Sequence, residues 1–296
     1  MKCMLCPRKC GADRERGETG FCRETAAVRV ARAALHMWEE PCISGKEGSG
    51  TVFFTGCTLR CVYCQNHQIS VGDVGKAVSE ERLSEIFLEL EAKGANNINL
   101  VTPTHFVPRI IRSLDRAKGQ GLKLPVVYNT GGYERVETLR MLEGYVDVYL
   151  PDFKYLNTEH AGNYSAAPDY PQTAMRAVEE MVRQAGGPVF DARGIMQKGV
   201  IVRHLLLPGC LQDAKQIVEY LYQTYGNQIY MSLMNQYTPL DTLDREKYPK
   251  LGKKVSRRAY ERLVDYAISL GVEQAFIQEG ETAKESFIPP FTLEGV

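Results

Sequence analysis

Strand-like and helix-like segments alternate along most of this chain, and this alternation constrains the fold more than any other feature of the sequence. Short apolar runs rich in β-branched and aromatic residues predict strands, and stretches with helical periodicity lie between them. The predicted strands cover residues 51–55, 98–102, 125–129, 146–150, 200–207, 229–233 and 274–277. The predicted helices cover residues 79–93, with Ser79 as N-cap, and 108–117, 133–142, 174–185, 213–225 and 256–269.

The order of these elements predicts parallel βα units and therefore an α/β fold. There are roughly six or seven units, fewer than the eight of a complete TIM barrel. We expect an incomplete, (β/α)6-like barrel of the TIM type at residues 51–280, with a doubly wound sheet as the alternative. Residues 1–50 lack the alternation and are expected to form a small Cys-rich, metal-binding lobe with little regular structure. Residues 281–296 are expected to form an extended tail over the barrel.

The composition is that of a globular protein, with charges in balance. Lys and Arg together number 36, as do Asp and Glu, so no net charge favours nucleic acid or an anionic membrane, although a local basic patch is compatible with this balance. The N-terminal residues MKCMLCPRKCGADRE contain no apolar h-region, and no segment approaches the ~18 apolar residues of a membrane helix. We expect a cytoplasmic protein that binds neither nucleic acid nor membrane.

Eight of the nine cysteines fall within the first 64 residues. In a reducing compartment this pattern favours metal binding or redox chemistry over disulfides. Cys57, Cys61 and Cys64 follow the first predicted strand in FFTGCTLRCVYCQNHQIS, at the barrel end where ligands of such barrels bind. A [4Fe–4S] cubane ordinarily takes four cysteines, so three would leave one iron for another ligand. The alternatives are a structural zinc site completed by another cysteine, and three thiols buried for packing.

A second group of thiols, Cys3, Cys6, Cys10 and Cys22, has the spacing of a metal knuckle. Pro7 and Gly11 permit the tight turns that such a knuckle needs. Structural zinc and a second iron–sulfur cluster are both open, with free thiols as a third alternative. Cys42 is a candidate spare ligand, and Cys210, which stands alone, is expected to be a buried small apolar residue.

The stretch CTLRCVYC, with Tyr63 before its last cysteine, resembles the radical S-adenosylmethionine (radical SAM) superfamily. The wider pattern is similar to the pyruvate formate-lyase activating enzyme-related (PflX-type) proteins. It rests on CMLCPRKCGADRERGETGFCR, WEEPCISGKEGSGTVFFTGCTLRCVYCQNHQIS, NTGGYE, YLPDFKY and HLLLPG. The resemblance implies a [4Fe–4S] cluster whose open iron chelates SAM. It also implies reductive cleavage of SAM to a 5′-deoxyadenosyl radical that abstracts hydrogen, with flavodoxin or ferredoxin as electron donor.

The resemblance also implies where SAM would be held. The family has a Gly-Gly-Glu segment after the second strand to bind the SAM amino group, whereas this chain has Val101–His105 there, with Thr102 or His105 as substitutes. The cofactor-binding residues that it implies are Tyr63, Thr102, Asn129, Thr130, Asp152, Lys154 and Arg203. His204 is expected to be a core histidine, Asn235 and Gln236 are candidate substrate contacts, and Glu134 is expected to cap a helix.

Three functions are compatible with these features. The first is activation of a glycyl-radical enzyme by hydrogen abstraction from a protein substrate. The second is radical SAM modification of another protein, a peptide or a small molecule. The third is a non-catalytic metal-binding scaffold, which would form no 5′-deoxyadenosine.

Overall fold

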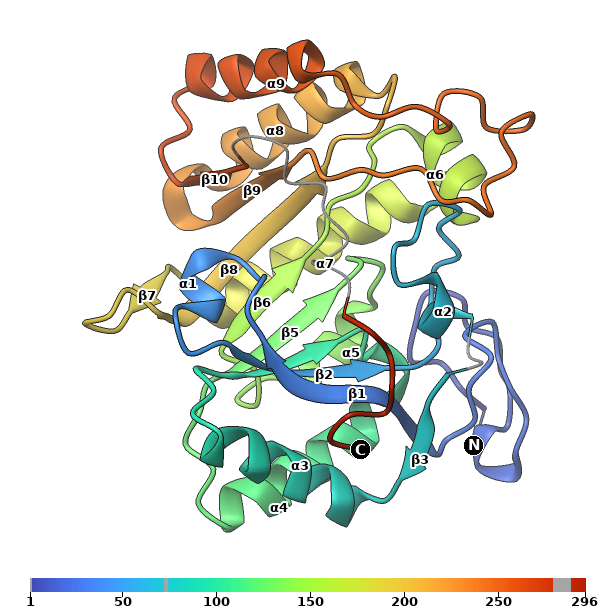
Figure 1. Cartoon of the computed structure of the whole chain (residues 1–296), viewed down its shortest axis with the longest axis vertical. Coiled ribbons are helices and arrows are strands. Elements are labelled where there is room, and N and C mark those ends of the chain that lie inside the picture. Colours follow the sequence, from blue (N-terminus) through green and yellow to red (C-terminus); the bar gives the residue numbers. More distant parts are fainter. Residues whose placement is uncertain (1, 72–73, 279–288) are drawn as a thin grey trace.

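The fold is built on one twisted, mostly parallel sheet (Figure 1). The computed structural model describes residues 2–71, 74–278 and 289–296. The parallel strands are β2 (Ser49–Phe54), β4 (Ile98–Val101), β5 (Val126–Thr130), β6 (Val148–Pro151), β8 (Met196–Leu205), β9 (Tyr230–Met234) and β10 (Ala275–Ile277). Each coincides with a predicted strand. In the described part of the chain no pairing joins β10 back to β2, so the predicted incomplete barrel is confirmed.

Helices connect these strands and cover the outer face of the sheet. The main helices are α3 (Glu80–Ala92), α4 (Val107–Gly119), α5 (Val136–Arg140), α7 (Tyr170–Ala185), α8 (Leu211–Tyr225) and α9 (Arg257–Leu270). The Ser79 hydroxyl accepts a hydrogen bond from the Arg82 amide at 3.1 Å, which confirms the predicted cap of α3. Shorter helical segments are α1 (Pro41–Ser44), α2 (His67–Ser70), α6 (Thr158–Ser165) and the 3-10 turns Arg14–Arg16, Thr104–Phe106 and Gly226–Gln228.

One long strand was not predicted. β1 (Val28–His36) pairs antiparallel with β2 and, on its other edge, with the short β3 (Lys76–Val78), so the expectation of little regular structure before residue 50 was wrong. Its sequence, VRVARAALH, contains three alanines, and alanine is depleted in strands. The strand is stabilised by burial against the sheet and not by its own propensity. A further short strand, β7 (Val189–Phe190), pairs with β8.

The described part of the predicted tail, residues 289–296, packs along β1. The Leu293 amide donates to the Ala31 carbonyl at 3.2 Å, and the Ala33 amide donates to the Glu294 carbonyl at 2.8 Å. Arg32 and Glu294 form an ion pair of 2.7 Å. Residues 281–288 of the predicted tail lie outside the described residues.

Residues on β5 and β6 alternate between two cores, as the two-residue period of a strand requires. Val126, Tyr128 and Tyr149 pack in the large core under the helices. Val127 and Val148 face the barrel interior, where α1 contributes Ile43 and Cys42. Within the described residues, no helix combines the length and apolar character that crossing a membrane requires.

Candidate functional site

A cavity lies at the carboxyl ends of the parallel strands, the end of the barrel that we call the mouth. Cys61, Tyr63 and Cys64 line it from the loop after β2, which confirms that this loop reaches the mouth. The other described residues that line this mouth cavity come from strand ends and loops, and include Trp38, Glu39, Asn129, Asp152, Lys154, Arg203, Leu205, Met234, Gln236 and Pro289. The cysteines and the polar residues implied by the sequence resemblance therefore share one space.

Close packing positions the three-cysteine loop (residues 56–64). Gly56 has φ +75°, and a Cβ atom there would lie 2.6 Å from the Cys22 carbonyl oxygen and 2.5 Å from Cγ of Glu24. Only glycine tolerates this approach, which brings the backbone of Cys22 against the residue preceding Cys57. The Ser165 hydroxyl donates to Sγ of Cys61 at 3.0 Å. Tyr63 is buried, and its hydroxyl pairs with that of Tyr155 at 2.5 Å.

Burial raises the pKa of two of these thiols, Cys57 and Cys64, the latter to about 11. Because the thiolate and not the thiol is the metal ligand, such a loop gains stability from bound cations that offset the burial of negative charge. Among the described residues, no three Cys, His, Asp or Glu side chains form a group that would hold a single metal ion. A cubane does not require such convergence, since each of its irons takes a separate thiolate.

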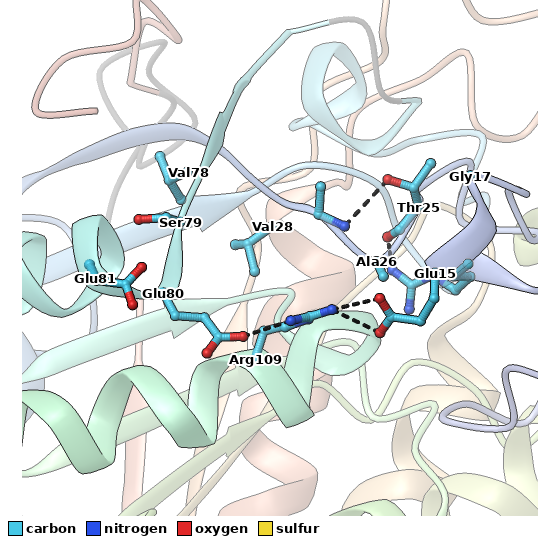
Figure 2. A pocket seen from close by; sticks show the side chains of 12 residues that line it. Glu15, Gly17, Thr25, Ala26, Val28, Val78, Ser79, Glu80, Glu81 and Arg109 are labelled. Carbon is cyan, nitrogen blue, oxygen red and sulfur yellow. Dashed lines mark hydrogen bonds and ion pairs between the residues drawn. The ribbon is translucent and has the colours of Figure 1, made fainter. Parts of the chain in front are cut away.

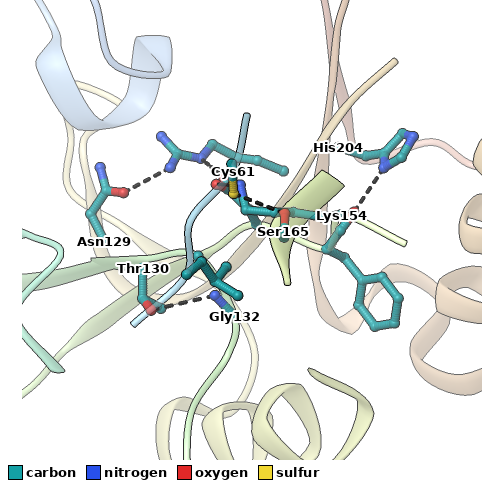
Figure 3. A network of polar contacts seen from close by, with 12 residues as sticks. Cys61, Asn129, Thr130, Gly132, Lys154, Ser165 and His204 are labelled. Carbon is teal, nitrogen blue, oxygen red and sulfur yellow. Dashed lines mark hydrogen bonds and ion pairs between the residues drawn. The ribbon is translucent and has the colours of Figure 1, made fainter. Parts of the chain in front are cut away.

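A compact cluster of charges occupies the floor of the mouth cavity. We call it the paired cluster, and its members are Glu39, Asn129, Asp152, Lys154 and Arg203. Arg203 is central: Nε donates to Oδ1 of Asp152 at 2.9 Å, Nη2 donates to Oδ1 of Asn129 at 2.7 Å, and Nη1 lies 3.3 Å from Glu39. Lys154 pairs with the other carboxylate oxygen of Asp152 at 2.6 Å. Figure 3 shows Asn129, Lys154 and Cys61 gathered in this network.

The charges of the paired cluster are not equally compensated, because burial outweighs Arg203 at Glu39 and raises the pKa of that carboxyl. Burial disfavours the ionised form of Asp152, but Arg203 and Lys154 outweigh it and lower the pKa of the carboxyl. For Lys154, burial acts against the charge, and the negative charge of Asp152 raises the pKa of the ammonium in spite of it. The mouth therefore presents fixed positive and negative groups side by side, which suits a ligand that itself carries charges of both signs.

Glu39 is a site residue that sequence reasoning missed. It precedes β2 by ten residues and lies on the segment between β1 and α1, which enters the barrel interior. Its side chain is only 9% exposed and accepts a hydrogen bond from Nδ2 of Asn129 at 3.1 Å. The signal that would have found it is the acidic pair Glu39–Glu40 directly before Pro41, an unusual placement for two carboxylates beside an apolar segment.

Thr102 and Thr130 are not among the described residues lining the mouth cavity. Thr130 follows Asn129 on β5 and therefore points to the opposite face, where its hydroxyl donates to Glu134. Thr102 has φ +58°, and its amide donates to the Asn129 carbonyl at 2.9 Å. His105, the other suggested substitute, is buried, with Nε2 bonded to the Thr55 carbonyl at 2.7 Å.

Glu134 does not cap a helix, so that prediction was wrong. Helix α5 begins at Val136 with Arg135 at the N-cap position. Glu134 is buried among hydroxyls: the Thr104 hydroxyl donates to it at 2.6 Å and the Tyr128 hydroxyl at 3.4 Å, besides that of Thr130. Burial, with no cation to offset it, raises the pKa of Glu134 to about 7. We call Thr104, Tyr128, Thr130 and Glu134 the hydroxyl cluster.

The remaining predicted residues lie in varied settings. His204 is buried, with Nδ1 bonded to the Phe153 carbonyl at 2.7 Å, as expected of a core histidine. Cys210 is buried as predicted, and Cys42 packs in the inner core. Gln236 lines the mouth cavity, and its carbonyl accepts a hydrogen bond from Gln65 at 3.0 Å.

The N-terminal cysteines form a compact knuckle beside the three-cysteine loop. The Cys3 amide donates to the Ala12 carbonyl at 2.9 Å, and the Gly11 amide donates to the Cys3 carbonyl at 3.1 Å. Cys6 and Cys22 are buried and Cys10 is exposed. Burial raises the pKa of Cys6 to about 12, and the nearby thiols of Cys22 and Cys3 add to the shift.

Arginines attach this knuckle to the barrel. Arg8 donates from Nε to the Thr58 carbonyl of the three-cysteine loop at 2.9 Å. Arg60 of that loop donates in return to the Phe21 carbonyl at 3.0 Å and stacks over the Phe21 ring at 4.1 Å. Figure 2 shows a second attachment, where Arg109 lies between Glu15 at 2.7 Å and Glu80 at 2.8 Å. These contacts join the knuckle to the three-cysteine loop and to helices α3 and α4.

Comparison with known proteins agrees with this geometry. The sequence profile of the Radical SAM superfamily matches residues 51–209, more than half of the chain, so the chain belongs to this superfamily. An uncharacterized protein of Methanocaldococcus jannaschii is 28% identical over 275 residues, which cover 90% of this chain and 74% of that protein.

Solved structures are similar in fold. Streptococcus suis SuiB bound to S-adenosylmethionine has a TM-score of 0.52 at 14% identity and covers 79% of this chain. HydG, a maturase of the [FeFe]-hydrogenase, has a TM-score of 0.52 at 17% identity and covers 78% of this chain. The chain spans about half of these proteins, 51% of SuiB and 52% of HydG.

Membership of the superfamily implies a [4Fe–4S] cluster and SAM, and the residues of the mouth fit both. Cys57, Cys61 and Cys64 supply three thiols from one loop, and two of them line the cavity that contains the paired cluster. When bound, the cluster and SAM supply a 5′-deoxyadenosyl radical by reductive cleavage. The polar residues of the mouth would orient SAM, and the aromatic and apolar residues of its lining, such as Phe53 and Tyr63, would limit the access of water.

Proposed function

We propose that this radical SAM enzyme abstracts hydrogen from a protein substrate, as in the activation of a glycyl-radical enzyme. The observation that carries the chemistry is the mouth cavity, where Cys61 and Cys64 lie opposite Asp152, Lys154 and Arg203. This arrangement holds an incomplete cluster and a zwitterionic ligand at one place. The protein substrate is supported by the PflX-type resemblance and by the rim of the mouth, where Trp38 is 55% exposed.

In this proposal the paired cluster binds SAM. Asn129, Asp152, Lys154 and Arg203 contact its polar groups, and Tyr63 lies near the adenine. Glu39 takes the place of the Gly-Gly-Glu carboxylate that the segment after β4 lacks, because it is the carboxylate beside Asn129 that faces the cavity. Glu39→Gln keeps the shape and removes the charge, and we expect SAM to bind roughly tenfold more weakly. Equal affinity of the two proteins, measured by calorimetry, would contradict this role.

The chemistry is tested by anaerobic reconstitution with iron, sulfide, a low-potential reductant and SAM. We expect 5′-deoxyadenosine to form, and Cys57→Ala, Cys61→Ala and Cys64→Ala each to abolish it while lowering iron bound per chain. Cys210→Ala is the matched control, because Cys210 is buried outside the mouth. Product formation by the three loop variants, or none by the native chain, would exclude the proposal in favour of a non-catalytic scaffold.

The substrate is tested separately. The reduced enzyme with SAM is incubated with glycyl-radical enzymes encoded near its gene, and the glycyl radical is recorded by EPR. Flavodoxin or ferredoxin is the electron donor in this proposal and is compared with a chemical reductant. An active enzyme that yields no radical on any such partner would direct the search to other proteins, peptides or small molecules.

We also propose a second metal centre, zinc or iron–sulfur, at Cys3, Cys6, Cys10 and Cys22. Among the described residues no three such side chains converge as a single zinc ion requires, which favours a cluster. Three of these thiols influence one another electrostatically, and Cys10 Sγ lies against Gly20, close in sequence to Cys22. Metal analysis of anaerobically purified protein and of Cys6→Ser tests the assignment. We expect the variant to lose one zinc ion or one cluster equivalent and to keep the cluster of the three-cysteine loop. Unchanged metal content would exclude a second centre.

A further inference from the structure

A groove outside the mouth combines an apolar floor with a basic rim. Its floor is formed at the end of β8 by Leu206, Leu207 and Pro208, and its far wall by Val255 and Ala259 at the start of α9. Lys250, Lys253 and Lys254 line its rim. We call this the basic groove. Among the described residues that line it none is acidic, so no side chain of the lining offsets the positive charge of the lysines.

The local sequence explains this charge. Residues 245–258, REKYPKLGKKVSRR, contain seven Lys or Arg and one Glu in a chain whose net charge is zero. Residues 245–256 belong to the long connection between β9 and α9, which extends past α6 in Figure 1, and Arg257 and Arg258 begin α9. Lys253 and Lys254 are exposed, and in the described part of the chain neither has an ion-pair partner. The stem of Lys250 lies over Gly209, where an added Cβ atom would meet Lys250 Cδ at 2.9 Å.

The basic groove adjoins the mouth cavity. Leu205 lines the mouth cavity, and the next two residues of the chain line the groove. Tyr237 lies between the two sites. Its hydroxyl donates to the carbonyl of Leu251, the residue after Lys250, at 2.5 Å, and its ring centroid lies 6.3 Å from that of Tyr63, which lines the mouth cavity. The basic groove and the mouth cavity are therefore lined by consecutive residues at the carboxyl end of β8.

We propose that the basic groove docks an acidic segment with apolar side chains on the protein substrate. This inference rests on the proposed action on a protein and names the chemistry of the segment that is recognised. Apolar side chains bury against the floor, and carboxylates meet the lysines, each exposed pair adding modestly. Nucleic acid fits less well, because a phosphodiester backbone would leave the apolar floor exposed or force its own charges against it.

Binding of a synthetic probe to the reconstituted full-length enzyme tests this proposal. The probe is a short fluorescent peptide that alternates Glu with Leu, compared with one in which Lys replaces each Glu. We expect the acidic peptide to bind, and Lys253→Glu with Lys254→Glu to weaken it roughly tenfold or more. Ala259→Phe, which enlarges a side chain on the far wall of the groove without changing the charge, should weaken peptide binding as well. The control is Lys46→Glu with Lys123→Glu, an equal reversal at two exposed lysines away from the groove.

Several outcomes would overturn the proposal. These are equal binding of both peptides, equal loss in the control and the groove variant, and loss on charge reversal with no loss in Ala259→Phe. Preferential binding of a single-stranded oligonucleotide that Lys253→Glu with Lys254→Glu abolishes would do the same. Formation of 5′-deoxyadenosine without substrate is measured in parallel. If the groove variants bind the peptide normally but SAM is cleaved, the docking proposal is wrong and the radical chemistry is unaffected. If the peptide binds as expected but SAM is not cleaved, only the proposed function is wrong.

Discussion

The paired cluster and the hydroxyl cluster contact adjacent residues of β5, Asn129 and Thr130, and they bury carboxyl groups by different means. In the paired cluster, Asp152 contacts Arg203 and Lys154, and its pKa is lowered. In the hydroxyl cluster, Glu134 contacts hydroxyls alone, and its pKa rises to about 7. The paired cluster favours the ionised form of Asp152 beside a cavity, whereas the hydroxyl cluster raises the pKa of a carboxyl group that no cation contacts.

The two clusters are therefore suited to different roles, one to ligand binding and the other to structural support. Fixed ionised groups facing a cavity are able to orient a charged ligand without reorganising. A carboxyl group among hydroxyls, on the helix side of the strand, instead joins the segment after β4 to the segment after β5. This contrast agrees with the proposal that the paired cluster binds SAM, and we propose that the hydroxyl cluster supports the strand ends.

Removing the central cation should produce the largest effect. Arg203→Met leaves Glu39 without its cation and Asp152 with Lys154 alone, and breaking a buried ion pair in this way costs about 3–5 kcal/mol. We expect the free energy of unfolding in urea to fall by about that amount and SAM binding to be lost. Arg203→Lys keeps the positive charge but lacks the planar guanidinium, so its free energy of unfolding and its SAM affinity should lie between those of the native protein and Arg203→Met. A decrease below about 1 kcal/mol would show that the cluster is not held by its charges.

Replacing Glu134 should change the stability by a smaller amount, and the change should be seen in how the stability depends on pH. Its pKa of about 7 in the folded chain exceeds that of an unfolded glutamate, about 4.3. The folded state therefore binds more protons between these values, so its stability falls as the pH rises from about 4.3 to 7, by roughly 3 kcal/mol. Glu134→Gln should remove this part of the decrease. Urea unfolding of both proteins at pH 5 and pH 8 measures it, and parallel pH dependences would show that Glu134 is ionised at both.

The sequence was sufficient to predict the parallel strands, the order of the connecting helices and the position of the three-cysteine loop. These features depend on local pattern: apolar runs, helical periodicity and the spacing of cysteines. β1 escaped prediction because its stability comes from pairing with β2 and from the C-terminal residues that lie along it, as in the bond from Leu293 to Ala31. No local pattern in VRVARAALH contains that information.

The site was predictable in part. The resemblance to a known family identified Asp152, Lys154 and Arg203 at or near strand ends, and the structure brings them together. Glu39 arrives from a segment before the barrel, so only the tertiary fold places it beside Asn129. Glu134 follows two glycines and precedes a helix, which resembles a cap in sequence. Its burial depends on the hydroxyls of Thr104 and Thr130, which come from different strand ends.

The finest test compares two adjacent residues, Asn129 and Thr130. Both follow from the same reasoning at the end of the third predicted strand, but a strand directs successive side chains to opposite faces. Asn129→Ala removes the amide that links Glu39 to Arg203, and we expect SAM to bind roughly tenfold more weakly. Thr130→Val removes a hydroxyl that donates to Glu134 and accepts from the Gly132 amide at 3.4 Å, and it should change SAM affinity by less than about twofold. Calorimetric titration of both reconstituted variants measures the contrast. If Thr130→Val weakened SAM binding as much as Asn129→Ala, the hydroxyl cluster would be part of the SAM site. The two faces of β5 would then not divide SAM binding from structural support.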